Sequence, residues 1–235
     1  MTNSNEYIGN ELELFEKAVN WKTYYGQFIK QHLRGRILEI GAGIGGTTAA
    51  LCDGTQEDWT CLEMDGNLSE KINELRQNGS IPSICRVVTG TVDSLSENDI
   101  YDVIIYIDVM EHIDDDSAEV IRALNHLKTG GKLIVLVPAH QWLYSPFDKA
   151  IGHYRRYNKE MMKAIVPDIM TQEQLFYLDS VGMAASVANM LFLKQFYPTE
   201  KQLKFWDDVL IRASRVMDML LRYSVGKSLM GIWKK

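Results

Sequence analysis

The sequence is poor in cysteine and proline, with three and five residues in a chain of 235. Cys52, Cys61 and Cys85 are odd in number and show no Cys-x-x-Cys spacing. Neither a disulfide framework nor a zinc cluster is therefore predicted, and no metal ligand is assigned. This use of cysteine is typical of the reducing cytoplasm, where we expect the protein to act.

Long apolar runs and a targeting segment are also missing. The start, Met1–Glu6, has neither a basic region nor an apolar run, which predicts no signal peptide. The longest apolar stretch, Val181–Leu193, is interrupted by Ser186 and Asn189 and is too short to span a membrane. An apolar share of 46% and a charged share of 24% are typical of one soluble globular domain.

Positive charge is scarce in most of the chain. The net charge of −6 disfavours a nucleic-acid partner. From Lys194 onward, however, the chain has nine Lys/Arg residues and four Asp/Glu residues, so the net charge is +5 in this segment and −11 in the residues before it. This basic segment is compatible with an acidic partner or with weak peripheral contact to a membrane surface.

One glycine-rich stretch stands out. The apolar run Arg36–Ile40 leads directly into Gly41, Gly43, Gly45 and Gly46. This pattern predicts a strand that ends in a turn where the backbone closely approaches a ligand. We expect a nucleotide-like ligand there, at the carboxyl end of the first strand of an α/β sheet.

The remaining pattern predicts a doubly wound α/β fold in a single domain. The domain consists of a helical leader (1–34), a core (35–179), a helical lid (180–225) and a last strand (226–235). Expected strands are Arg36–Ile40, Trp59–Glu63, Ile84–Thr89, Tyr101–Asp108, Lys132–Val137, Gln174–Asp179 and Ser228–Trp233. Expected helices are Asn10–Val19, Trp21–Lys30, Asn67–Asn78, Asp116–Lys128 (with Asp116 as its cap) and Lys159–Val166.

Two further helices, Val181–Phe196 and Thr199–Tyr223, precede the last predicted strand. The first is almost wholly apolar and methionine-rich (Met183, Met190, Leu191, Phe192, Phe196), which suits an apolar or amphipathic ligand. The second carries an apolar stripe along one side: Leu203, Trp206, Val209, Leu210, Ala213, Val216, Met217 and Leu220. These helices would form a homodimer interface, additional core or, as the family that further motifs resemble implies, a lid over the bound ligand.

Two cofactors fit the glycine turn. Gly41-x-Gly43-x-x-Gly46 followed by Glu63 satisfies the fingerprint of dinucleotides such as NAD. Gly41-x-Gly43-x-Gly45 directly after Glu39 is instead typical of enzymes that use S-adenosylmethionine.

Further motifs favour the second cofactor. Leu62–Asp65, Gly90–Asp93, Asp108–Ile113 and Gly130–Leu133 follow the glycine turn in order. With these motifs the chain resembles the class I, Rossmann-like methyltransferases over about residues 35–140. The resemblance implies a seven-stranded sheet of order 3-2-1-4-5-7-6 with strand seven antiparallel, and methyl transfer from S-adenosylmethionine.

The resemblance also implies the cofactor site. Glu63 would accept the ribose hydroxyls, Glu39 and Asp108 would lie near the ammonium and sulfonium groups, and Met64 and Val92 would hold the adenine. Thr91 stands where the family usually has Asp, which leaves Asp93 or the backbone as alternative contacts of the adenine. His112 would contact the cofactor or order its loop. The predicted cofactor residues are Glu39, Gly41, Ala42, Gly43, Gly45, Glu63, Met64, Thr91, Val92, Asp108, Val109 and His112.

The segment Gly152–Tyr157 (Gly-His-x-Arg-Arg-Tyr) and the tail Gly226–Leu229 resemble those of one bacterial subgroup of these methyltransferases. The predicted catalytic residues are His153 and His140, and the predicted acceptor-binding residues are Arg155, Arg156, Tyr157 and Tyr154. The arginines would clamp an anionic acceptor, or pair with Asp148 or Asp168 to brace their loop.

The predicted reaction is methylation of a small molecule, first of all at an oxygen atom, which includes a carboxylate. Nitrogen and carbon acceptors stay open, as do an NAD-dependent oxidoreductase and a non-catalytic binding module. A base is needed only where the acceptor oxygen carries a proton of high pKa.

Overall fold

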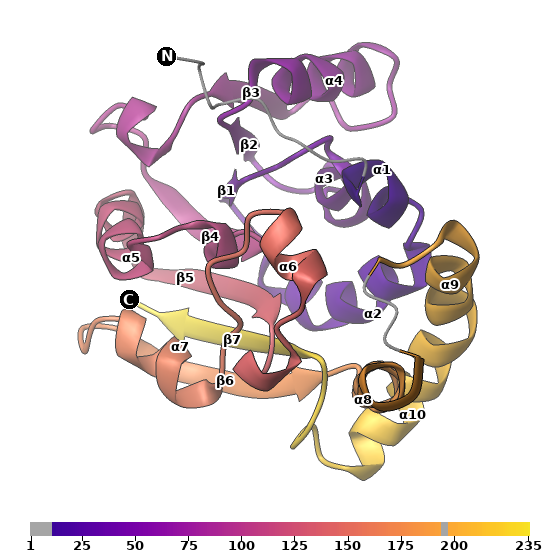
Figure 1. The fold of residues 1–235 in the computed structure, drawn as a ribbon. Helices are drawn as coiled ribbons and strands as arrows, with labels where there is room; N and C mark the ends of the chain where they lie inside the picture. Colours follow the sequence, from indigo (N-terminus) through magenta and orange to yellow (C-terminus); the bar gives the residue numbers. More distant parts are fainter. Residues whose placement is uncertain (1–10, 194–196) are drawn as a thin grey trace, which may run out of the picture.

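The computed structural model describes residues 11–193 and 197–235 and confirms the predicted sheet (Figure 1). Seven strands follow the order β3-β2-β1-β4-β5-β7-β6, and β7 runs antiparallel to both of its neighbours. The strands are β1 Arg36–Ile40, β2 Asp58–Glu63, β3 Cys85–Thr89, β4 Tyr101–Ile107, β5 Leu127–Pro138, β6 Thr171–Leu178 and β7 Ser228–Lys234.

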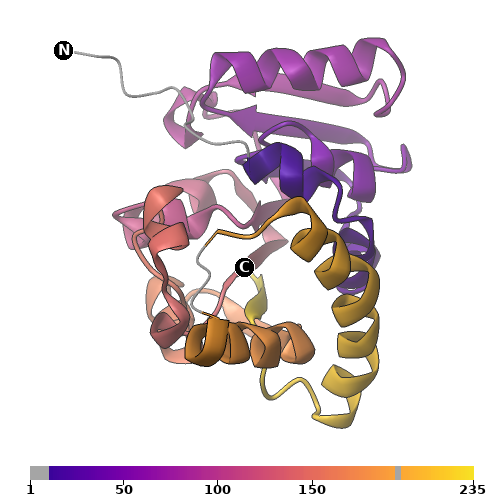
Figure 2. The same cartoon turned by 45° about the vertical axis from the view of Figure 1, so that its right-hand side comes forward.

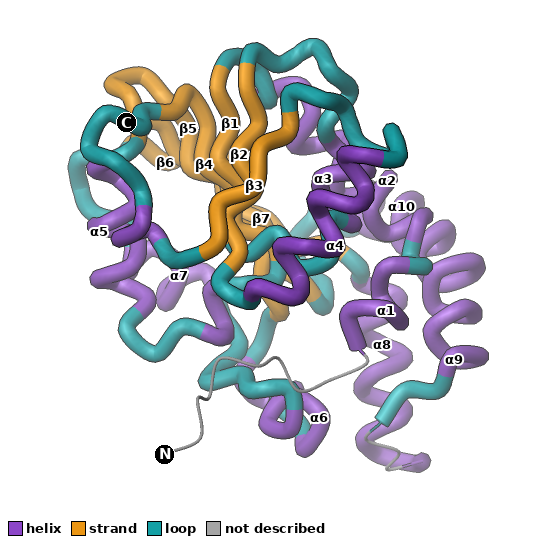
Figure 3. The backbone as a smooth tube through the Cα atoms, turned by 90° about the horizontal axis from the view of Figure 1, so that it is seen from above, coloured by secondary structure: helices purple, strands orange, loops and turns teal. Residues whose placement is uncertain are grey.

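Helices cover both faces of this sheet (Figure 3). The helices α5 Asp116–Asn125 and α7 Lys159–Ile165 pack on one face. The other face carries α2 Val19–Ile29, α3 Gly46–Leu51, α4 Gly66–Gln77 and α10 Ile211–Leu220. This double cover explains why β4 is apolar almost throughout, since a central parallel strand is buried on both sides.

The start of α5 differs by one residue from the prediction. Asp115, not Asp116, caps the helix, and its Oδ1 accepts a hydrogen bond of 3.0 Å from Ala118 N. The carboxylate of Asp116 instead accepts, through Oδ2, a 2.6 Å bond from the hydroxyl of Tyr157. Adjacent acidic residues can each cap a helix, and the pattern alone did not separate them.

A short helix that the sequence analysis did not predict follows β5. This helix, α6 Pro146–Ala150, begins with a capping box in which Ser145 and Asp148 bond to each other's backbone N–H groups. It has proline in its first turn, a position where the missing N–H costs nothing. The capping box fixes Asp148 near the carboxyl ends of β4 and β5.

The C-terminal helices lie alongside the N-terminal ones (Figure 2). They comprise α8 Ser180–Ala188, the π-helical turn η5 Asn189–Leu193, α9 Glu200–Phe205, the π-helical turn η6 Trp206–Leu210 and α10. The leader comprises α1 Glu11–Glu16 and α2. Residues 1–10, and Phe196 of the predicted lid, lie outside the described residues. Among the described helices, none has both the length and the apolar character needed to cross a bilayer.

The predicted apolar stripe of the last helices is mostly exposed on the single chain. Leu203 is buried, but Val209, Val216 and Leu220 are 48%, 54% and 67% exposed. The side that packs inward is instead partly polar, with Asp207, Ser214 and Asp218 buried. These groups satisfy backbone N–H donors: Asp218 binds those of Asp179 and Ser180, and Asp207 binds that of Trp21.

Asp218 also joins the two ends of the chain, because Tyr24 donates to it a buried hydrogen bond of 2.7 Å. Tyr24→Phe should lower the free energy of unfolding by about 2 kcal/mol, since this bond has a charged acceptor. The midpoint of thermal unfolding should fall by roughly 4–8 °C. Tyr25→Phe is the matched control, because the Tyr25 hydroxyl lies 3.2 Å from a neutral partner, Thr47 Oγ1. An equal or larger loss for Tyr25→Phe would contradict this account.

Candidate active site

The predicted glycine turn joins β1 to α3 in a left-handed conformation. Gly41, Gly43 and Gly45 have φ values of 69°, 56° and 82°. A Cβ atom on Gly41 would lie 2.5 Å from Cγ2 of Val109. Only glycine fits at this position, and Gly41 stays partly exposed at the carboxyl end of β1. The rest of the turn from Ala42 to Gly45 is buried, and the N–H groups of Gly41, Gly43 and Gly45 donate within the protein.

Glu63 ends β2 and connects this turn to the next loop. Its carboxylate is buried, with Oε2 2.7 Å from Gly43 N and Oε1 3.0 Å from Asp65 N. Burial raises its pKa, and the backbone hydrogen bonds oppose that rise. Each carboxylate oxygen accepts more than one hydrogen bond, so these contacts leave acceptor capacity for a pair of ribose hydroxyls.

Glu39 lies beneath the turn rather than in the open. Its Oε2 accepts hydrogen bonds of 2.6 Å from Thr48 Oγ1 and 2.8 Å from Trp59 Nε1. Burial raises the pKa of Glu39 to about 7, although both bonds lower it. These contacts tie β1 to β2 and α3, and a role toward the cofactor ammonium stays a prediction.

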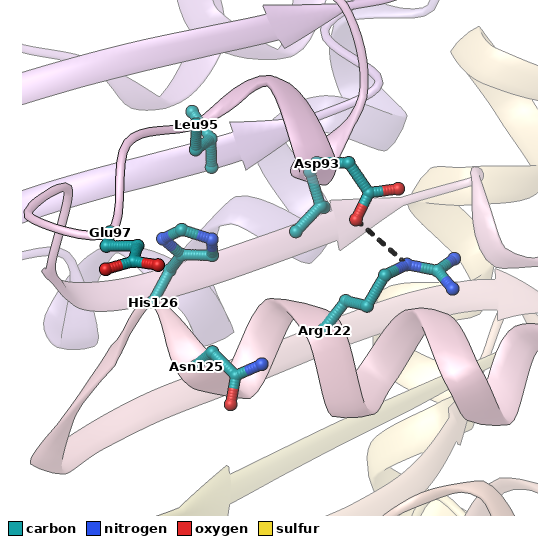
Figure 4. Close-up of a pocket in the computed structure, with 7 residues that line it drawn as sticks. Asp93, Leu95, Glu97, Arg122, Asn125 and His126 are labelled. Carbon is teal, nitrogen blue, oxygen red and sulfur yellow. Dashed lines mark ion pairs between the residues drawn. The ribbon is translucent and has the colours of Figure 1, made fainter.

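The side chains predicted to hold the adenine follow β2 and β3. Val92 is buried, whereas Met64 is 54% exposed and presents an apolar surface. Thr91 forms a capping box with Ser94 at the start of the 3₁₀ turn η2 Val92–Ser94. Asp93 forms an ion pair with Arg122 of α5 at 3.7 Å, beside a surface pocket (Figure 4). Contact of the adenine with Thr91 stays a prediction, with Asp93 or the backbone as the alternative contacts.

Asp108 follows β4 with a φ of 54°, an uncommon conformation for a residue other than glycine. Asp108 is exposed to solvent. Partial desolvation by the protein around it raises the pKa of Asp108 to about 7, while Arg156 and Lys227 act in the opposite direction. Strained backbone of this kind is concentrated at functional sites.

Three further polar side chains meet just beyond Asp108. Glu111 and His112 belong to the 3₁₀ turn η3 Met110–His112, and His153 lies between α6 and α7. One ligand-type atom of each lies within 4.8 Å of those of the other two. The His112 and His153 rings pack edge to face with their centroids 4.5 Å apart. Burial lowers the pKa of His112 to about 4, with His153 acting in the same direction.

Asp148 organises the segment that carries His153. Its Oδ1 lies 3.0 Å from His153 Nδ1, and Arg156 binds both carboxylate oxygens at 2.8 and 3.1 Å. Burial alone would raise the pKa of Asp148, but the bonds from His153, Arg156 and Ser145 hold it well below its usual range. The predicted pairing of an arginine with Asp148 is therefore confirmed for Arg156.

Arg155 and Tyr157 are also engaged within the protein. Arg155 pairs with Asp116 rather than with Asp168, and its NH2 donates to Asp114 O at 2.6 Å. The Tyr157 hydroxyl contacts Asp116 and the carbonyl of Met110. Tyr154 is 55% exposed, beside Arg155. Acceptor binding by these four residues stays a prediction, and Arg155 and Arg156 have structural partners in this state.

His140 is separate from the His153 cluster in its contacts. Its ring stacks on Tyr177 with centroids 4.9 Å apart, and burial lowers its pKa. Its Nε2 has no hydrogen-bond partner among residues 11–193 and 197–235. A catalytic role for either histidine stays a prediction, but only His153 joins Glu111 and His112.

Sequence reasoning missed three contributions to this site. Glu111 entered only as part of a motif, although it is buried and burial raises its pKa well above the usual range. Asp148 entered only as one of two arginine partners. Lys227 of the tail lies over Trp206, and burial lowers its pKa while Asp179, Asp148 and Asp108 oppose that change. The Glu111-His112 pair was the available signal, but its partner His153 is 41 residues further on.

Comparison with known proteins agrees with the fold. A model of the methyltransferase domain family matches residues 14–177. Among solved structures, coclaurine N-methyltransferase bound to N-methylheliamine and SAH is similar with a TM-score of 0.64 and 13% identity, over 93% of this chain and 72% of that one. An S-adenosylmethionine-dependent methyltransferase from Clostridium acetobutylicum ATCC 824 has a TM-score of 0.58 and 12% identity, over 93% and 91%.

The same architecture also occurs with other chemistry. The [4+2]-cyclase SpnF is similar with a TM-score of 0.63 and 11% identity, over 97% of this chain and 94% of that one. At such low identity these structures show the fold alone. No match was found among curated proteins.

The sheet order and the glycine turn together define a Rossmann-like, cofactor-binding α/β domain. The family model covers more than half of the residues, so the chain belongs to the methyltransferase domain family. Solved structures with this fold include S-adenosylmethionine-dependent enzymes. The residues present fit that cofactor: a left-handed glycine turn after β1, a buried ribose-type carboxylate at Glu63 and apolar surface at Met64.

Proposed function

We propose that this protein transfers a methyl group from S-adenosylmethionine to a hydroxyl oxygen of a small-molecule acceptor. The acceptor would bind beyond the carboxyl ends of β4 and β5, where parallel strands of such sheets present ligands. The cofactor would lie over the glycine turn, with Glu63 on its ribose and Met64 and Val92 beside its adenine. Asp108 would contribute negative charge near the sulfonium end.

The reaction is an in-line displacement at carbon. The S–CH3 bond breaks with its electrons moving to sulfur, while the acceptor oxygen forms the new O–CH3 bond. Because the sulfonium is already activated, the protein mainly aligns the two reactants and excludes water. A hydroxyl acceptor must also lose its proton, and a nearby group has to accept or neutralise it.

One observation supports an acceptor of this class: His153, ordered by Asp148, faces Glu111 and His112 at the end of β4. Groups that can take up or neutralise a proton thus gather where the acceptor is expected. The carboxylate acceptor considered from sequence has less support, because Arg155 and Arg156 are both paired with internal carboxylates. A hydroxyl acceptor, small and without large net charge, agrees best with these contacts.

The first test is thermal unfolding with and without S-adenosylhomocysteine. Ligand at 100 times its Kd should add about 2.7 kcal/mol to the free energy of unfolding. For a domain of this size the midpoint should rise by roughly 5–10 °C. Glu63→Ala should abolish the shift, because it removes the acceptor of the ribose hydroxyls.

Glu57→Ala is the matched control, since Glu57 is exposed and directly precedes β2, whereas Glu63 is the last residue of that strand. It should retain the full shift. A shift with NAD alone would favour the oxidoreductase alternative and contradict the proposal. If S-adenosylhomocysteine binds, release of S-adenosylhomocysteine from S-adenosylmethionine should then be measured with hydroxyl, carboxyl and amine acceptors. Turnover with amines alone would overturn the oxygen assignment.

A further inference from the structure

The cluster Glu111–His112–His153 contains a buried oxygen atom without a partner. Glu111 is 1% exposed, and its Oε2 forms no hydrogen bond within the described part of the chain. Its Oε1 lies 3.8 Å from His153 Nε2, too far for a hydrogen bond. A buried carboxylate oxygen without a donor is costly, so this site calls for a cation or a further donor.

The protonation state of His153 follows from its neighbour. Asp148 offers only acceptor atoms when ionised, so His153 Nδ1, 3.0 Å from Asp148 Oδ1, must carry the proton. In the neutral ring this leaves a lone pair on Nε2, the atom on the side of Glu111. A carboxylate that holds the far nitrogen of a histidine is the usual second partner of a metal-binding imidazole.

From this arrangement we propose that Glu111, His112 and His153 bind one divalent transition-metal ion. Two imidazoles and one carboxylate suit ions such as Zn²⁺, Mn²⁺ or Co²⁺, whereas Mg²⁺ and Ca²⁺ prefer oxygen ligands throughout. Three protein ligands leave at least one coordination position open, as in catalytic metal sites. Ligand atoms around one such ion lie about 3.4 Å apart, so from separations of up to 4.8 Å the side chains close inward by about 1 Å.

The local charges are compatible with a cation. The Arg156 guanidinium acts on Glu111, and its charge is matched by the two-point pair with Asp148. The Lys227 ammonium faces Asp179 and Asp108. Asp108 also acts on Glu111, which places a second acidic group on this side of the cluster.

The role of the ion rests on the proposed function, whereas its binding does not. An acceptor hydroxyl in the open position would lose its proton to solvent, because a bound divalent ion lowers the pKa of a ligated O–H group. The resulting oxygen anion would then take the methyl group. In this account His153 is a ligand of the ion rather than the group that removes the proton.

Binding is tested first, without cofactor or acceptor. Chelator-treated protein is dialysed to equilibrium against Zn²⁺ in one arm and Mg²⁺ in another, and Co²⁺ binding is followed by visible absorption. We expect one Zn²⁺ per chain, and we expect Glu111→Gln and His153→Gln to weaken binding at least 100-fold. Asp148→Asn should weaken it 10- to 100-fold through the orientation of His153.

His126→Gln is the control, since His126 contacts Asp99 O at the opposite end of β4. It should bind Zn²⁺ as the unchanged protein does. Thermal unfolding with S-adenosylhomocysteine shows whether each variant keeps its fold and its cofactor site. Three results would each overturn the proposed site: absence of stoichiometric Zn²⁺, Zn²⁺ binding by Glu111→Gln and His153→Gln as tight as in the unchanged protein, or binding of Mg²⁺ alone.

The role is tested separately with an accepted hydroxyl substrate. Chelation should lower turnover at least 100-fold, and Zn²⁺, Mn²⁺ or Co²⁺ should restore it. Bound Zn²⁺ with turnover that ignores chelation would overturn the role of the ion while leaving methyl transfer itself intact. If S-adenosylhomocysteine does not raise the thermal unfolding midpoint of the unchanged protein, that result would instead count against the proposed function, whatever the outcome for the metal.

Discussion

Gly41→Ala should weaken binding of S-adenosylhomocysteine at least 100-fold and remove its thermal shift. The new Cβ atom would lie 2.5 Å from Cγ2 and 2.9 Å from Cγ1 of Val109. Because both atoms belong to a branched side chain at the site itself, relief requires the turn or the loop after β4 to move. The left-handed φ of 69° adds about 1 kcal/mol for alanine. Isothermal titration with S-adenosylhomocysteine measures the effect.

Gly79→Ala separates backbone strain from the steric clash. Gly79 has nearly the same conformation, with a φ of 77°, but nothing lies within 4 Å of its Cβ position. It should lose about 1 kcal/mol of stability and keep its cofactor affinity. Val109→Ala added to Gly41→Ala should recover part of the affinity, because it removes both clashing methyl groups. Equal affinities for Gly41→Ala and the unchanged protein would refute the assignment of the turn.

Asp148→Ala should be the most destabilising of the substitutions considered. It leaves Arg156, a residue that is only 8% exposed, without its two-point carboxylate partner. Breaking a buried ion pair in this way costs about 3–5 kcal/mol. The midpoint of thermal unfolding should fall by roughly 6–20 °C. Asp168→Ala, at an exposed position in the same region of the sequence, should change it little.

The same pair predicts how stability depends on pH. The folded-state pKa of Asp148 is depressed, so its stabilisation is fully present above the unfolded value of about 4. It is lost as the pH falls below that value toward the folded pKa. Denaturant titrations at pH 7 and near pH 3 should therefore show a smaller difference between the unchanged protein and Asp148→Ala at the lower pH. A constant difference would mean that Asp148 is not ionised in the folded state.

The sheet was predictable because its signals are local. Each strand from β1 to β4 is a short apolar run followed by a turn or a motif of fixed spacing, as is the second half of β5, and the resemblance supplied the strand order. The glycine turn and Glu63 followed for the same reason, since both lie at the ends of strands. Boundaries were less certain: β6 begins at Thr171, three residues before the predicted start, and α5 ends at Asn125 rather than Lys128.

The polar interior could not be predicted, because it depends on partners far apart in the sequence. Asp218 is buried because it meets Tyr24 and the N–H groups of Asp179 and Ser180 at the start of α8. The apolar stripe of α10 therefore could not indicate that this polar side packs inward. His153 and Glu111 likewise meet through the fold of the α6 segment, which Asp148 holds in place.

The position of β7 has a consequence for synthesis of the protein on the ribosome. β7 is the last strand in the chain, yet it lies between β5 and β6 and pairs with both. β6 ends at residue 178 and β7 begins at residue 228, so residues 179–227 are translated while the facing edges of β5 and β6 lack their partner. Such edges readily pair with other chains, and the delay makes this the stage at which the nascent protein is most prone to aggregate and to need a chaperone.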